Sequence, residues 1–271
     1  MDGILSIPRL FKYVNAKAAI TILEKKTLQW STPDSFNDPF EFKSPFAYGL
    51  KWDEMTEVAL QQFAKILTQP PESRLLVQQW KEDTVRNAGN WREMKKTHLV
   101  LCLSTVHNHL LMWSRYADNH RGAVLGFRPI IQLSTPTLFA TPILFARPVF
   151  YSLEVPVAAA LKEYVEYLTA ERTKPDALDA FERSVYTKSS VWAYENEWRV
   201  LDKKRTGEVG AFAYREFHPQ ELDAVYLGCR MLPEDRKRII ELVASWGAPV
   251  SLFQTRDCRI RFELADEPIS L

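Results

Sequence analysis

Glycine is scarce in this chain, with nine glycines among 271 residues. Neither the G-x-G-x-x-G pattern nor the G-x-x-x-x-G-K-S/T pattern occurs, and these are the motifs with which Rossmann folds and P-loops hold the phosphates of nucleotides. The sequence therefore argues against a nucleotide site built on a glycine-rich loop.

A strong net charge is also missing, since 35 basic and 34 acidic residues leave a formal charge of +1. No global field draws the protein toward nucleic acid, so broad nucleic-acid binding is not expected. The three cysteines, Cys102, Cys229 and Cys258, lack C-x-x-C spacing, which argues against a disulfide framework or a zinc site. His107 and His109 have no acidic neighbour at metal-ligand spacing, so no metal is expected.

Long apolar runs are absent as well. No stretch approaches 18 apolar residues, the length typical of a membrane-spanning helix. The first residues show no basic segment followed by a long apolar one, so no signal peptide is expected. We therefore expect a soluble, cytoplasmic protein with no membrane partner.

What the chain does contain is short apolar strands between amphipathic helices, with 46% apolar residues to form a core. Strands are predicted at 11–14, 28–31, 99–103, 123–127, 224–228, 250–253 and 259–264, and helices after Asn15, at 110–116 and after Pro233. The run at 259–264 alternates, which predicts that Ile260, Phe262 and Leu264 face the core.

Two further helices are predicted within residues 52–95, where they interrupt the strand pattern. The economical interpretation is a single α+β domain over residues 1–271, with mixed or antiparallel central sheets, flanking helices and a helical insertion around 52–95.

The most informative stretch is W-A-Y-E-N-E-W-R, which ends at Arg199. An apolar run follows it, so the stretch is predicted to be a strand on which Glu195, Glu197 and Arg199 share one face. Paired carboxylates repel each other and often serve acid–base chemistry, so both glutamates are candidate catalytic residues. The alternative is an edge strand whose glutamates face water while Trp192 and Trp198 enter the core.

Two clusters near the N-terminus are candidate ligand contacts. Lys12 and Tyr13 lie on the first strand, where a tyrosine can stack on a planar ligand or simply close the edge of the core. Asn37 and Asp38 lie in the loop F-N-D-P-F, where they either contact a ligand or hold the turn through bonds to their own backbone.

A third cluster spans the segment from Trp113 to His120. Trp113 and Tyr116 share one face of the predicted helix, which by itself indicates core packing. The polar tail that follows ends in His120 and Arg121, and a histidine can donate or accept a hydrogen bond near neutral pH.

At these residues the sequence resembles a mostly bacterial family, domain of unknown function 2971, whose label carries no activity. The matching blocks run in order through most of the chain: Lys12-Tyr13, Phe36 to Phe40, Cys102 to Ser104, Met112 to Ala117 with His120 and Gly122, Lys188, Trp192, Tyr194 to Arg199, and Tyr226 to Gly228.

A more distant resemblance is to ADP-ribosyltransferases, in the opening strand, the helix that follows and a short strand ending in Ser31. This resemblance implies NAD as a substrate and places the catalytic carboxylate on Glu197, the second of the Glu-x-Glu pair. It also implies an aromatic wall at Trp113 or Tyr116. Tyr13 stands where many members have His or Arg, and the Ser-Thr-Ser motif of the arginine-specific branch is absent.

The implied function is ADP-ribosyl transfer or NAD hydrolysis, as in a bacterial toxin, effector or defence protein, with an acceptor that the sequence does not name. A carboxylate would stabilise the oxocarbenium-like ribose, and Lys12 or Arg199 would neutralise the pyrophosphate. The alternative is a non-catalytic ligand-sensing or interaction protein on the same fold, in which the glutamates bond arginines such as Arg115, Arg121 and Arg199. A nucleic-acid-directed enzyme or toxin is a third, weaker option.

Overall fold

The structure is a computed structural model that describes residues 7–42, 82, 86, 89–134, 137–140, 142–155 and 183–270. Its contacts divide the chain into two compact units. Unit 1 comprises Met1–Ser31, Leu99–Val149 and Val191–Leu271, and unit 2 comprises Thr32–His98 and Phe150–Ser190. The single domain expected from the sequence stays a prediction. Most of the predicted insertion at 52–95 lies outside the described residues.

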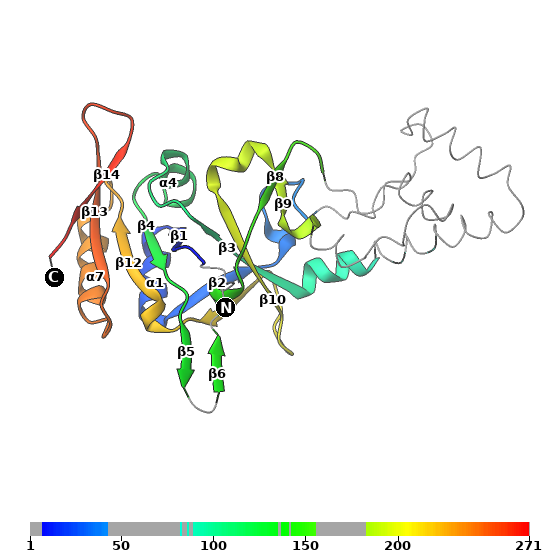
Figure 1. Cartoon of the computed structure of the whole chain (residues 1–271). Helices are drawn as coiled ribbons and strands as arrows, with labels where there is room; N and C mark the ends of the chain where they lie inside the picture. The colour runs from blue at the N-terminus through cyan, green and yellow to red at the C-terminus, as the bar shows by residue number, and fades with distance from the viewer. Residues whose placement is uncertain are drawn as a thin grey trace, which may run out of the picture. The chain divides into compact units, whose positions relative to one another are not determined.

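Unit 1 is built on a ten-stranded mixed sheet (Figure 1), which confirms the α+β class. Its main path runs β11-β2-β3-β1-β4-β12-β13-β14, and β10 pairs with β3 and β7. The strands are β1 (Leu10–Val14), β2 (Thr27–Ser31), β3 (His98–Ser104), β4 (Ala123–Phe127), β7 (Arg147–Pro148), β10 (Glu197–Lys203), β11 (Phe212–Glu216), β12 (Leu222–Leu227), β13 (Ser251–Asp257) and β14 (Leu264–Pro268). β12 and β13 run parallel, whereas β1 pairs antiparallel with β3 and β4.

The predicted helix after Asn15 is α1 (Ala16–Lys25). The Asn15 side chain accepts a hydrogen bond from the backbone N–H of Ala18 at 2.8 Å, as expected of an N-cap. The helix ends at Lys26, whose left-handed backbone (φ 55°) lets its N–H bond the carbonyl oxygen of Ile22. The cap therefore fixes where this helix starts, and its buried residues define the face that packs: Ala16, Ala19, Ile22 and Leu23.

Two helical layers cover the two faces of the sheet. α1 and α7 (Pro233–Ala244) pack against each other over one face, together with Leu10 and Leu125 of the sheet. α4 (Leu110–Tyr116) packs over the other face, against Tyr13 and Tyr226. Successive strand residues alternate between these layers, so Lys12 and Tyr13 leave β1 on opposite sides.

The remaining elements are short. Unit 1 also holds the hairpin β5 (Ile131–Ser134) and β6 (Thr137–Ala140), with the 3₁₀ turns η3 (Pro142–Phe145) and η5 (Pro219–Glu221). The turn η4 (Ser190–Glu195) precedes β10. None of the helices among the described residues combines the length and apolar character needed to cross a bilayer.

Unit 2 contributes the 3₁₀ turn η1 (Pro33–Ser35) and the parallel pair β8 (Phe150–Ser152) and β9 (Thr187–Ser189). Residues 89–97 are helical. Within this unit the indole N–H of Trp91 donates to the Phe42 carbonyl oxygen at 2.8 Å.

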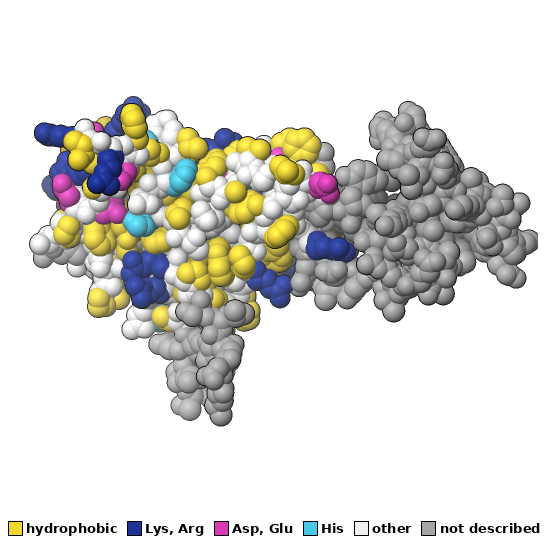
Figure 2. All heavy atoms as spheres, turned by 45° about the horizontal axis from the view of Figure 1, so that its top comes forward, with side chains coloured by type: hydrophobic (Ala, Val, Ile, Leu, Met, Phe, Trp, Pro, Cys, Tyr) yellow, Lys and Arg dark blue, Asp and Glu magenta, His cyan; other side chains and the backbone are white. Residues whose placement is uncertain are grey.

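The predicted strand at 259–264 is wrong for most of its length. Asp257 pairs with Leu264 across β13 and β14, so the residues between them form the connecting turn. Leu264 is buried, but Ile260 is 85% exposed and Phe262 is 101% exposed. Figure 2 shows hydrophobic and basic side chains intermingled over this hairpin, at the upper left. Alternation alone does not distinguish a strand from an alternating turn.

Candidate functional site

Glu195 does not lie on a strand beside Glu197, which corrects the prediction. It is the last residue of η4, and β10 begins only at Glu197. Asn196 separates the two with a left-handed backbone (φ 43°), a conformation that asparagine tolerates better than most residues. The two carboxylates therefore have separate environments, and both are buried.

Glu195 is held by α4 and β3. The hydroxyl of Tyr116 donates to Glu195 Oε1 at 2.5 Å. The hydroxyl of Ser104 donates to the Glu195 backbone oxygen at 2.6 Å, within a buried contact. The first contact fixes the side chain of Glu195 and the second fixes its backbone.

Further aromatic rings and one cation lie next to Tyr116 and on the turn η4 that ends at Glu195. The Arg115 guanidinium lies 4.4 Å from the Trp192 ring centroid and 5.9 Å from that of Tyr116. Tyr194 stacks on His109, with centroids 5.2 Å apart and an angle of 19° between the rings. Arg115 is exposed and the four rings are partly exposed. Flat, partly exposed rings beside a carboxylate and a guanidinium suit a ligand with a planar ring and an anionic group.

Glu197 faces Arg199 instead, on the same side of β10. Arg199 Nε donates to Glu197 Oε1 at 2.8 Å, and Arg199 Nη2 donates to Oε2 at 3.1 Å. The two side chains are 0% (Arg199) and 5% (Glu197) exposed. The sequence pattern correctly predicted that Glu197 and Arg199 share a face of the strand. Their side chains form a bidentate ion pair inside the protein.

Lys12 and Cys102 complete this polar cluster. The Lys12 ammonium donates to the Cys102 carbonyl oxygen at 2.9 Å. Burial lowers the pKa of Lys12, although Cys102 and Glu197 oppose that shift. Burial and then the negative charge of Glu197 raise the pKa of the Cys102 thiol well above its ordinary value. Both effects follow from charge held where water is scarce.

Tyr13 and Trp113 meet on the α4 side of the sheet. Their rings pack edge to face, with centroids 5.8 Å apart. Tyr13 donates to the Val106 carbonyl oxygen at 3.0 Å, and burial raises its pKa. Trp113 is fully buried and its indole N–H donates to the His107 carbonyl oxygen at 2.7 Å. Tyr13 and Trp113 are therefore buried core residues. Tyr116 is the aromatic residue of α4 whose side chain contacts Glu195.

His120 belongs to the turn that ends α4. Asp118, Asn119 and His120 all have left-handed backbones, and the His120 N–H donates to the Trp113 carbonyl oxygen at 3.2 Å. The His120 ring stacks on Trp113, with 6° between the planes and centroids 6.2 Å apart. Burial and then the nearby Arg230 lower its pKa, which favours the neutral imidazole at pH 7.

His107 has an acidic neighbour that sequence spacing did not reveal. Its Nε2 lies 2.7 Å from Asp266 Oδ2, and Thr255 donates to Asp266 Oδ1 at 3.3 Å. The ring also lies 4.4 Å from that of Tyr226. The pair joins residues 159 positions apart, so spacing in the sequence could not have suggested it.

The remaining candidate residues lie elsewhere. Ser31 ends β2, where its backbone pairs with Phe212 of β11 and Val100 of β3. In unit 2, Asp38 accepts a hydrogen bond from the Phe40 N–H at 2.8 Å, so the predicted bonding of Asp38 within its own turn is confirmed. Ligand contacts by Ser31, Asn37 and Asp38 stay predictions.

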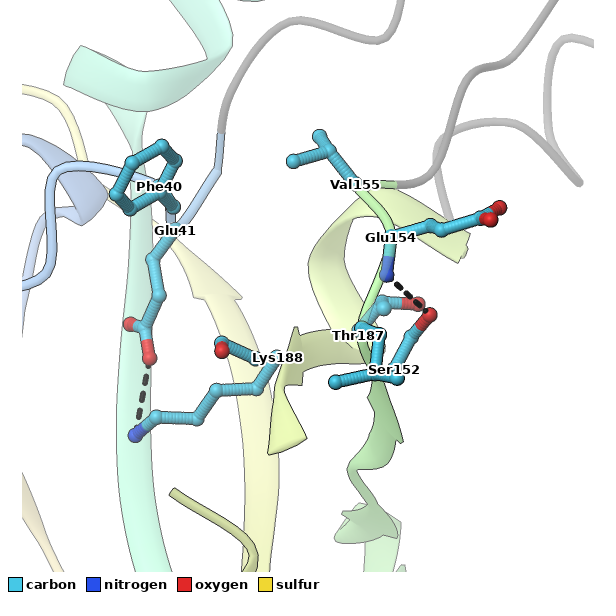
Figure 3. Close-up of a pocket in the computed structure, with 9 residues that line it drawn as sticks. Phe40, Glu41, Ser152, Glu154, Val155, Thr187 and Lys188 are labelled. Atoms are coloured by element: carbon cyan, nitrogen blue, oxygen red, sulfur yellow. Dashed lines mark hydrogen bonds and ion pairs between the residues drawn. The ribbon is translucent and has the colours of Figure 1, made fainter. Parts of the chain in front are cut away.

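Unit 2 also holds an ion pair beside a cavity. Lys188 Nζ lies 2.9 Å from Glu41 Oε1, and Figure 3 shows the two side chains pointing toward one another. Both residues line a cavity of about 210 Å³. Glu41 directly follows the F-N-D-P-F loop, but no spacing pattern predicts its pairing with Lys188, because the two residues lie far apart in the chain.

A family model described as a protein of unknown function (DUF2971) matches residues 112–200. This match confirms the resemblance to that family, and it spans Tyr116, Glu195, Glu197 and Arg199. Comparison with curated proteins and with solved structures found no match. The likeness to ADP-ribosyltransferases therefore stays a prediction.

Proposed function

We propose that this protein transfers ADP-ribose from NAD, with Glu195 as the catalytic carboxylate. The observation that carries the proposal is the 2.5 Å hydrogen bond between Tyr116 and Glu195 beside partly exposed aromatic rings. Two residues singled out from distant parts of the sequence meet there. Glu197, favoured by the resemblance, is instead engaged on both oxygens by Arg199.

In the proposed reaction the bond between ribose C1′ and the nicotinamide nitrogen breaks, and its electron pair leaves with nicotinamide. The ribose then carries an oxocarbenium-like positive charge, which a fixed carboxylate stabilises. A nucleophile adds to C1′ and loses its proton. With water as nucleophile, NAD⁺ and water give ADP-ribose, nicotinamide and one proton.

The surrounding side chains fit separate parts of NAD. Trp192 and Tyr194 offer flat faces for the nicotinamide or adenine ring. Arg115 is exposed and its guanidinium suits the pyrophosphate, a role the sequence had suggested for Lys12 or Arg199. The Tyr116 hydroxyl orients Glu195 and keeps its charge in one position.

The first test is turnover itself. The protein is incubated with NAD, and free nicotinamide is measured with and without cell lysate as a source of acceptor. Release without lysate supports NAD hydrolysis, and release only with lysate supports transfer.

Tyr116→Phe should lower kcat by about 10- to 100-fold, because a hydrogen bond to a charged group contributes about 1.5–3 kcal/mol. An unchanged kcat would remove Tyr116 from the site.

A second candidate is a non-catalytic ligand-binding protein on the same fold. The buried Glu197–Arg199 pair favours it, since a carboxylate satisfied on both oxygens is suited to holding structure. This candidate predicts saturable binding of NAD or a related nucleotide, measured by calorimetry, with no nicotinamide released at any protein concentration.

A further inference from the structure

One face of β11 presents two aromatic side chains to solvent. β11 is the first strand on the main path of the sheet, and burial alternates along it, so Phe212 and Tyr214 are exposed while Ala213 and Arg215 are buried. Phe212 is 49% exposed and Tyr214 is 59% exposed. Residues two apart on a strand lie about 6.6–6.8 Å from each other, so two ring systems stand side by side on this face.

The neighbouring strand β2 adds polar groups beside these rings. In the antiparallel register Ser31 lies opposite Phe212, and Gln29 lies opposite Tyr214. Residues that lie directly opposite on antiparallel strands project to the same face. The Tyr214 hydroxyl donates to Gln29 Oε1 at 3.4 Å. The face therefore offers rings for stacking, together with a hydroxyl and an amide for hydrogen bonding.

The turn that leads into β11 supplies positive charge. Residues 202–215 contain four basic and two acidic side chains. Both acids, Asp202 and Glu208, accept hydrogen bonds from the buried Arg215. Lys203 and Arg205 are exposed. The acids of the turn are thus engaged by an internal cation, and the basic side chains face solvent.

Hydrogen bonds hold this turn alongside β11. Lys204 Nζ donates to the Gly210 carbonyl oxygen at 2.5 Å, just before the strand begins. Arg215 Nη2 donates to the Lys203 carbonyl oxygen at 3.2 Å. Glu216, at the far end of the strand, is exposed and would repel phosphate. Positive charge therefore borders the aromatic pair, and the candidate surface ends before Glu216.

A single strand of nucleic acid has the chemistry that complements this surface. Its bases present flat faces that stack on aromatic side chains, and its phosphates pair with cations beside them. Base edges and the 2′-hydroxyl of RNA can bond the amide and hydroxyl groups. A neutral oligosaccharide would leave the basic turn unused. The net charge of +1 predicts no broad attraction to nucleic acid, so binding depends on this one surface.

We propose that the exposed face of β11 and β2, bordered by the basic turn at 203–205, binds single-stranded RNA or DNA. The proposal goes beyond NAD cleavage and does not depend on it, since the binding is measured without NAD. It rests on the paired aromatic rings, the polar groups opposite them and the adjoining positive charge, all within unit 1.

The test measures binding of labelled oligonucleotides to the full chain by fluorescence anisotropy, with strands of about ten nucleotides. Single-stranded RNA or DNA should bind with a dissociation constant of about 100 µM or tighter at about 0.15 M salt, and a duplex of the same length at least about fivefold more weakly. The tighter of the two single strands identifies the source of the ligand. No saturable binding of either single strand, or equal or tighter binding of the duplex, would overturn the proposal.

Aromatic variants locate the stacking surface. Phe212→Ala and Tyr214→Ala should each weaken single-strand binding by about fivefold or more, because each removes a stacking ring. Phe262→Ala is the matched control, since Phe262 is also exposed but lies between β13 and β14. It should leave the affinity unchanged. Unchanged affinity in folded Phe212→Ala and Tyr214→Ala proteins, or an equal loss in the control, would refute the assignment.

Charge variants test the basic turn. Two phosphate contacts on a single strand predict a slope of about −1.4 when the logarithm of the binding constant is plotted against that of the salt concentration. The double variant Lys203→Gln, Arg205→Gln should bring this slope toward zero. Arg259→Gln, Arg261→Gln removes two exposed charges elsewhere in the same unit and should keep it. A slope unchanged in the first variant would contradict the proposal.

Two measurements on the unaltered chain keep the proposal testable if a variant fails to fold. The backbone amide shifts that saturate with added oligonucleotide should be largest at Gln29, Phe212 and Tyr214. Shifts that cluster elsewhere would place the ligand outside this surface and contradict the proposal. A neutral glucose oligosaccharide should not bind. If it shifts these amides while the oligonucleotides do not, the surface binds sugars and the proposal is wrong.

Discussion

Replacing Glu197 by glutamine should destabilise the protein severely. The substitution keeps the shape of the side chain but removes its charge, and the fully buried Arg199 guanidinium loses its carboxylate. Breaking a buried pair by removing one partner costs about 3–5 kcal/mol. A domain of this size loses about 2–4 °C of melting temperature per kcal/mol. We therefore expect the melting temperature of Glu197→Gln to fall by about 6–20 °C, as measured by circular dichroism.

The chain offers a matched control in Glu267→Gln. Arg256 Nε lies 3.0 Å from Glu267 Oε2 and both side chains are exposed, so this pair should contribute at most about 1 kcal/mol. A double replacement of Glu197 and Arg199 by methionine should recover much of the lost stability, because it removes both charges of the pair together. If Glu197→Gln melts within about 2 °C of the Glu267→Gln control, the structural role given to Glu197 is wrong.

Three further outcomes are expected. The Cys102 thiol has a strongly raised pKa, so iodoacetamide should alkylate it more slowly than Cys258 in the native protein at pH 8; equal rates by mass spectrometry would contradict this. Arg215 holds the pKa of Glu208 at about 2, below the ordinary 4.5, so the stability contributed by that carboxylate is present above about pH 4.5 and is lost as the pH falls toward 2. The melting temperatures of wild type and Glu208→Gln should therefore differ at pH 6 and converge near pH 2, and a constant difference would refute the linkage. Trp113→Ala should lower the free energy of unfolding, measured in urea, by about 3–5 kcal/mol because it leaves a cavity. A much smaller decrease would show that Trp113 is not a core residue.

Much of the sheet and its helices could be predicted because local signals determine them. β1, α4 and α7 follow from apolar periodicity, and the start of α1 follows from the Asn15 cap. Alternation also predicted the shared face of Glu197 and Arg199. These elements depend on contacts within one turn or along one strand, which neighbouring residues in the sequence reveal.

Other features depend on contacts that local patterns do not carry. Asn196 adopts a left-handed backbone that starts β10 two residues later than periodicity suggests. Ile260 and Phe262 alternate with arginines as a strand would, yet they lie in a turn because Leu264 resumes the pairing. The His107–Asp266 contact joins distant segments, so only the folded chain brings the two together.

The candidate site was predicted in part. The sequence singled out Tyr116 and Glu195 from separate segments, and their side chains meet. It assigned the pyrophosphate to Lys12 or Arg199, but Arg199 is fully buried against Glu197. Arg115, exposed beside the aromatic rings, is the better placed cation, and its position on the outer side of α4 gave no spacing signal.

The role of Glu195 is tested by measuring nicotinamide release from NAD by the Glu195→Gln variant, with Glu216→Gln as control. Glu216 lies exposed on β11, away from the pair formed by Glu195 and Tyr116. We expect kcat to fall by about 100-fold or more in Glu195→Gln, because the substitution keeps the hydrogen-bonding shape but removes the charge that stabilises the oxocarbenium. Glu216→Gln should lose no activity. Full activity in a folded Glu195→Gln protein would show that Glu195 is not the catalytic carboxylate.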